Sequence, residues 1–97
     1  MTMADESPAE RRRARLRFRA QRRGFKEADL IFGAFADEFL PGLDDRGLGD
    51  FELLLDQPDQ EVFAWLKGSE PVPAHFDTDV FGKLKSLCAR RNPKWGS

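Results

Sequence analysis

The hexapeptide RRGFKE (22–27) brings together the side chains of this sequence that are best suited to polar recognition. Arg23 presents several N–H donors in a rigid fork, and Glu27 presents two acceptor oxygens four residues later. Gly24 favours a tight bend, because glycine adopts left-handed backbone angles without steric cost. With Phe25 between the two charges, the pattern is typical of a recognition corner set on the ends of helices.

The same residues also fit an interpretation that needs no partner. Gly24 would then end one helix and allow the next to begin. Arg23 would lie in the last turn of the first helix and Glu27 in the first turn of the second, where the helix dipole favours each charge. The sequence leaves both interpretations open.

Elsewhere the sequence offers little that could perform catalysis. His75 is the single histidine, and no motif supplies it with a nucleophile. Cys88 is the single cysteine and falls on an apolar stripe, so we expect a buried thiol rather than a reactive one. These two residues are too few for a structural zinc site, and the eight glycines form no phosphate loop. We therefore expect a binding protein that is not an enzyme, with no metal and no cofactor of its own.

The composition favours one small all-α domain. The chain has 97 residues, and only six of them are β-branched, which makes a sheet improbable. No apolar run approaches the ~18 residues of a membrane span. The N-terminus lacks the apolar segment of a secretory signal, and a single cysteine suits a reducing compartment, so we expect a cytoplasmic protein with no membrane partner.

Hydrophobic periodicity and helix-ending residues predict a five-helix bundle in which two helices are short. The predicted helices cover about 8–23, 26–40, 45–56, 59–67 and 78–91. We expect residues 1–7 to be disordered, 8–92 to form a single helical domain and 93–97 to be a tail. No predicted helix is apolar on two faces, which favours a monomer.

The first predicted helix has two apolar pairs at i, i+4 spacing. Ala14 and Phe18 form one pair, and Leu16 and Ala20 form the other. In the last predicted helix, Thr78 or Asp77 is a candidate cap. Asp44 and Asp59 are candidate caps of the third and fourth helices.

The run RRRARLRFRAQRR (11–23) concentrates basic charge at one end of the chain. Residues 1–25 hold eight arginines and three acids, whereas 26–97 hold eight basic and fourteen acidic residues. Such a run could follow phosphates, which makes a small regulatory or nucleic-acid-binding protein the alternative function. It could equally be a solvated helix face, or a surface that docks on an acidic protein. An acidic body would repel nucleic acid, so we expect no nucleic-acid partner.

Several segments together resemble the succinate dehydrogenase flavinylation and assembly factors, the SdhE-type proteins. RGFKE (23–27) matches their RGxxE motif, and an apolar helix, ADLIFGAFADEFL (28–40), follows directly. LLLDQPD (53–59) and VFAWLKGSEPVP (62–73) come next in the order and spacing of the family. The similarity covers roughly residues 14–91, and its details look most like alphaproteobacterial members.

The resemblance implies a small five-helix fold and a non-enzymatic assembly role. Members of the family bind the flavoprotein subunit of succinate dehydrogenase, and in some bacteria that of fumarate reductase, and promote covalent attachment of FAD to a histidine of that subunit. No dinucleotide-binding motif is present here, so FAD binding by the factor itself is not carried over. By resemblance, the partner-binding residues are Arg23, Gly24 and Glu27 of the motif, extended by Arg22, Phe25 and Asp29.

Overall fold

The computed structural model describes residues 7–24 and 26–91, which hold five α-helices, two 3-10 turns and no strand. The helices are α1 (Pro8–Ala20), α2 (Lys26–Phe39), α3 (Asp45–Leu55), α4 (Asp59–Lys67) and α5 (Asp79–Arg91), with turns η2 (Leu40–Gly42) and η3 (Ala74–Phe76). This arrangement confirms the predicted all-α five-helix fold, with α3 and α4 as the shorter helices. The expected disorder of residues 1–7 and the tail fall largely outside the described residues.

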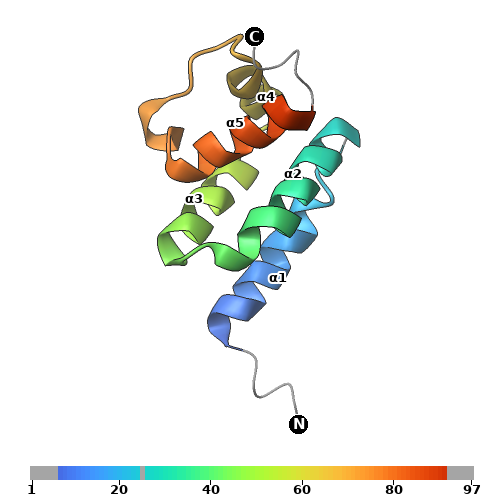
Figure 1. The fold of residues 1–97 in the computed structure, drawn as a ribbon, viewed down its shortest axis with the longest axis vertical. Helices are drawn as coiled ribbons and strands as arrows, with labels where there is room; N and C mark the ends of the chain where they lie inside the picture. The colour runs from blue at the N-terminus through green and yellow to red at the C-terminus, as the bar shows by residue number, and fades with distance from the viewer. Residues whose placement is uncertain (1–6, 25, 92–97) are drawn as a thin grey trace.

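All five helices contribute side chains to the core. The α1 and α2 helices lie side by side and antiparallel, α3 packs on α1, and α5 packs on both α2 and α3 (Figure 1). The short α4 helix packs against α5. The bend that connects α1 to α2 therefore lies at one end of the bundle.

Polar side chains begin three of the helices. The Ser7 hydroxyl accepts a hydrogen bond from the Glu10 N–H at 3.1 Å, and the Asp44 carboxylate accepts one from the Gly47 N–H at 2.8 Å. The Thr78 hydroxyl accepts one from the N–H of Phe81. These bonds satisfy backbone donors that a first helical turn leaves unpaired, and those of Asp44 and Thr78 confirm two predicted caps.

One predicted end of a helix and one predicted cap were wrong. The α1 helix ends at Ala20 rather than at residue 22 or 23, because the Arg22 N–H bonds to the Arg19 carbonyl and tightens the chain out of the α-helix. At the start of α4, Pro58 is the cap residue and Asp59 forms no side-chain cap. The Asp59 carboxylate is engaged elsewhere, as described below.

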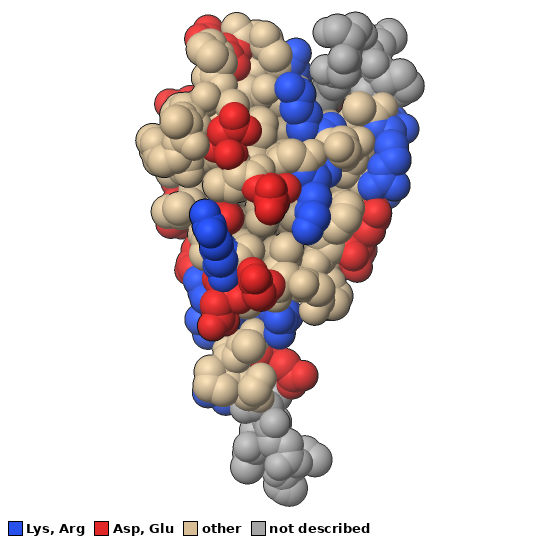
Figure 2. All heavy atoms as spheres, turned by 60° about the vertical axis from the view of Figure 1, so that its left-hand side comes forward, with Lys and Arg blue, Asp and Glu red and all other residues tan. Residues whose placement is uncertain are grey.

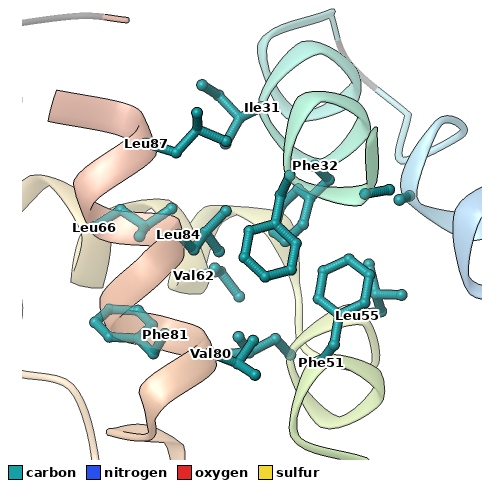
Figure 3. Close-up of a cluster of buried hydrophobic side chains, with 14 of the residues drawn as sticks. Ile31, Phe32, Phe51, Leu55, Val62, Leu66, Val80, Phe81, Leu84 and Leu87 are labelled. Atoms are coloured by element: carbon teal, nitrogen blue, oxygen red, sulfur yellow. The ribbon is translucent and has the colours of Figure 1, made fainter. Parts of the chain in front are cut away.

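Aromatic rings form the centre of the core. Side chains from α2, α3, α4 and α5 converge there, among them Phe32, Phe51, Val62 and Leu84 (Figure 3). The Phe35 and Phe51 ring centroids are 4.8 Å apart, within the range of favourable aromatic packing. Burial of these rings is the main driving force for the fold.

The structure shows which of the two apolar pairs of α1 belongs to the core. Leu16 and Ala20 are buried, whereas Phe18 is exposed. On α4, Phe63 is buried. The Trp65 ring is also buried and is stacked on Phe76 at 5.1 Å between centroids, so its role is packing.

The thiol of Cys88 is expected to resist alkylation and disulfide exchange. Burial raises the pKa of this thiol to about 12, because the thiolate is poorly solvated in the core. At pH 8 the folded protein should therefore react with a thiol-specific chromogenic disulfide far more slowly than the urea-unfolded chain. Equal rates in the two states would show that Cys88 is accessible.

Candidate partner-binding site

Arg23 fastens the α1–α2 bend to the body of the protein. Its Nε donates to the Asp59 carboxylate at 2.7 Å, and the same carboxylate forms an ion pair with Nη2. Nη1 donates to the Leu55 carbonyl, and Nη2 donates to the Gln57 carbonyl at 3.0 Å. The side chain of Arg23 is only 9% exposed. The guanidinium group thus joins the end of α3 to the start of α4.

This set of contacts suits the electrostatics of the α3–α4 corner. The last carbonyls of a helix lack intrahelical partners and carry the negative end of the helix dipole, so a guanidinium group is a favourable partner for them. The Arg23 guanidinium carbon also lies 5.1 Å from the centroid of the Phe32 ring, a cation–π distance. Arg23 is therefore held by polar groups on one side and by the aromatic core on the other.

The position of Arg23 adds a role that the sequence did not predict. Its guanidinium group is engaged by acceptors within the protein, so we assign it the role of positioning the bend. Asp29 has a similar role, because its Oδ1 accepts the backbone N–H of Arg23 at 2.6 Å. This bond links the start of α2 to the segment that precedes it, and Asp29 is half-buried.

Gly24 permits the shape of the bend. Its φ angle is +121°, a backbone conformation that residues with a Cβ rarely adopt. A Cβ added at Gly24 would meet no other atom within 4 Å. The constraint on Gly24 within this chain is therefore its backbone conformation, and the space around it is open to an approaching partner.

Glu27 and Arg22, together with Lys26, are charged groups that the bend presents to solvent. Glu27 lies in the first turn of α2 and borders a surface hollow of about 270 Å³. The rest of the hollow comes from α4 and the segment that follows it: Gln60, Phe63, Ala64, Lys67 and Ser69. The guanidinium carbon of Arg22 lies 4.5 Å from the centroid of the exposed Phe18 ring. Phe25 lies outside the described residues.

The α4 side of this hollow was missed by the sequence analysis. Helical periodicity places Gln60, Ala64 and Lys67 on one face of α4, at i, i+4 and i+7, and that pattern was visible in the sequence. It carried no sign that this face lies beside Glu27. In the structure, the Arg23–Asp59 ion pair and the packing of the Phe63 ring on the Phe32 ring both hold α4 beside the bend and α2.

The arginine run on α1 holds helices together. Arg12 pairs with Glu52 at 3.0 Å, and Arg19 pairs with Asp56 at 2.7 Å, so two ion pairs connect α1 to α3 and the residue after it. Arg13 donates to the carbonyls of Leu40 and Leu43, at 3.2 and 2.6 Å. The run is therefore more than a solvated helix face, which was one interpretation of the sequence.

These pairings also account for the uneven charge of the sequence. Much of the basic charge of α1 meets acids or carbonyls of the rest of the chain. On the face seen in Figure 2, lysine and arginine side chains are interspersed with aspartate and glutamate. Neither sign dominates that face, as it would on a surface that follows phosphates along a nucleic acid.

The described residues contain no catalytic or metal-binding arrangement. No group of three or more His, Cys, Asp or Glu side chains among them could hold a metal ion. His75 is exposed on the turn η3, and Cys88 is buried. Within residues 7–24 and 26–91, no helix is long and apolar enough to cross a bilayer. A larger hollow of about 750 Å³, between the starts of α3 and α5, has a lining of mixed charge.

The fold and the bend define a small helical binding protein whose candidate site is a surface corner. The chain belongs to the family described as the flavinator of succinate dehydrogenase, whose model matches residues 14–88. This match confirms the resemblance seen in RGFKE (23–27) and the segments that follow it. The matched region begins within α1 and includes the bend, α2, α3, α4 and most of α5.

Curated relatives carry names of the same kind. The chain is 35% identical over 82 residues to the "FAD assembly factor SdhE" of Acetobacter pasteurianus, covering 84% of this chain and 74% of that protein. It is 35% identical over 82 residues to "Succinate dehydrogenase assembly factor 2, mitochondrial" of Dictyostelium discoideum, covering 84% of this chain and 58% of that protein. A protein of the same name from Mycosarcoma maydis is 38% identical over 82 residues, covering 82% of this chain and 34% of its own length. The chain thus spans about half the length or less of these two mitochondrial relatives.

Replacing Arg23 with alanine should destabilise the fold by about 3 kcal/mol, because the change leaves a nearly buried carboxylate and two carbonyls without their partner. Arg19→Ala is the matched control, since the Arg19–Asp56 pair is exposed and should contribute less than about 1 kcal/mol. Urea unfolding followed by circular dichroism measures both variants. Equal losses would contradict the special role of Arg23.

Proposed function

We propose that this protein is an assembly factor that binds the flavoprotein subunit of succinate dehydrogenase and promotes covalent attachment of FAD to it. The observation that carries the proposal is the family match over residues 14–88, which includes a rigidly held bend with Glu27 exposed beside a hollow. The flavoprotein subunit of fumarate reductase is a second client, which the resemblance to the family implies. The protein acts as a monomer in the bacterial cytoplasm and is not an enzyme.

The factor acts by selecting a conformation of its client. FAD supplies the bond-forming chemistry inside the flavoprotein, and this chain supplies binding energy. A ligand that binds one conformation more tightly than another shifts the population towards it. A surface that is preorganised by Arg23 loses little entropy on binding, so more of the contact energy is available for that shift.

The chain needs no FAD of its own for this role. The hollow beside Glu27, at about 270 Å³, falls below the range of pockets that enclose drug-sized ligands, and FAD is larger still. The larger hollow is bordered by four aspartates and by two basic residues, Arg46 and Lys83, so its lining is acidic on balance and would disfavour the FAD diphosphate. These observations support a factor that acts on FAD only within its partner.

The alternative of a nucleic-acid-binding protein has weaker support. The arginines that would have to reach phosphates include Arg12, Arg13 and Arg19, which are paired within the fold. A phosphate-binding protein would lose affinity for a DNA or RNA duplex steeply as salt is raised. We expect this chain to bind the flavoprotein and to show no salt-sensitive binding to a duplex. The opposite pair of results would favour the nucleic-acid-binding function.

Replacing Glu27 with alanine should reduce covalent flavin on a co-expressed succinate dehydrogenase flavoprotein subunit. The side chain is exposed at the candidate site, and loss of one polar interface contact typically weakens binding by about five- to thirtyfold. In-gel fluorescence of covalently bound flavin measures the effect, with and without the factor. Asp37→Ala is the matched control, because Asp37 is also an exposed acid on α2.

Two results would count against this proposal. If the wild-type factor gives no gain in covalent flavin on a folded, FAD-supplied client, the assembly function is wrong. If Glu27→Ala and Asp37→Ala both match the wild type, the bend is not the site. Circular dichroism of each variant should be unchanged, since neither side chain is buried.

A further inference from the structure

Two large apolar side chains are exposed on either side of the bend. Phe18 on α1 is 58% exposed, and Leu30 on α2 is 56% exposed. Phe18 lies midway between Leu16 and Ala20, both buried, so it faces away from the core. Leu30 is related in the same way to two buried residues, Ala28 and Phe32. Packing of this chain therefore does not account for either exposed side chain.

Both side chains are continuous with the bend. Phe18 contacts Arg22 at 4.5 Å between ring centroid and guanidinium carbon, and Arg22 is two residues before Gly24. Leu30 follows Glu27 by three residues and so lies next to it on the surface of α2. We call Phe18, Arg22 and Leu30 the flanking patch.

Basic charge is concentrated on the α1 side of this patch. Arg12, Arg13 and Arg19 have partners within the fold. Arg22 and Arg15 are exposed, and neither forms an ion pair among the residues that the structure describes. The α1 side of the patch thus combines an exposed ring with unneutralised arginines, which complements an apolar surface bordered by carboxylates, whereas Glu27 adjoins Leu30 on the α2 side.

We propose that the flanking patch is a second area of contact with the client flavoprotein, docking on an apolar surface of the flavoprotein that is bordered by acidic residues. This inference rests on the proposed function and extends it. Phe18 and Leu30 supply apolar anchors, and Arg22 pairs with a client carboxylate while it remains stacked on Phe18. Aromatic and arginine side chains that lose water on binding are the residues that most often dominate interface energies.

The test measures the affinity of the full chain for the immobilised, FAD-free flavoprotein subunit of succinate dehydrogenase. Phe18→Ala and Leu30→Ala should each weaken binding by about tenfold. Arg22→Glu should also weaken binding, and its effect should be larger at low salt than at high salt, because salt screens charge interactions. Leu53→Ala is the matched control, because Leu53 is a similarly exposed apolar residue, 46% exposed, on α3. It should bind as the wild type does. Urea unfolding confirms that all four variants remain folded.

The outcomes separate this inference from the proposed function. If Phe18→Ala and Leu30→Ala bind like Leu53→Ala while Glu27→Ala binds weakly, the flanking patch is not a contact and the assembly function stands. If the wild-type chain does not bind the flavoprotein, the proposed function fails and this inference fails with it. If sedimentation shows self-association that Phe18→Ala abolishes without changing client affinity, the patch serves a second copy of the chain, and the inference is overturned.

Discussion

The contact of Arg23 with the α3–α4 corner is the interaction on which the geometry of the site depends. One guanidinium group meets two terminal carbonyls of the α3 region and the carboxylate of Asp59 at the start of α4. A lysine could not replace it, because a single ammonium group lacks the planar fork that reaches several acceptors at once. Through this group the bend, α3 and α4 become one rigid surface.

The site therefore consists of residues with two different tasks. Arg23, Asp29 and Gly24 fix the path of the chain, by hydrogen bonds in the first two cases and by a positive φ angle in the third. Glu27 and Arg22 are left to present charge to solvent. Division of this kind reduces the conformational entropy that binding would otherwise remove. Within this motif, some residues hold the bend in place and others are exposed on the surface that the bend forms.

The α1 helix shows how misleading a run of like charge can be. In the sequence, its arginines look like a row of positive charges exposed to solvent. In the structure, several of them donate hydrogen bonds to carboxylates or carbonyls of α3, of η2 and of the residues just after these elements, 27 to 40 residues away. The acidic excess of residues 26–97 is therefore in part the internal counterpart of α1. The side chains of Arg11, Arg15 and Arg22 remain exposed, and Arg22, just beyond the end of α1, lies against the Phe18 ring.

The sequence by itself determined the all-α fold, the number of helices and most of their ends, because helix periodicity and capping are local properties of the chain. It also located the bend and the family, through RGFKE (23–27) and the segments after it. It could not decide which apolar pair of α1 is buried, since Leu16 and Phe18 are equally suited to a core by type. Only the direction from which α2 and α3 approach makes that choice.

The role of Arg23 was likewise decided by tertiary structure. Its acceptors come from residues 55, 57 and 59, and no local pattern connects an arginine at 23 with a helix end more than thirty residues later. The hollow beside Glu27 likewise depends on where α4 packs in the folded chain. The sequence singled out the residues of the candidate site because their types are unusual, whereas their contacts depend on distances between segments that only the folded chain sets.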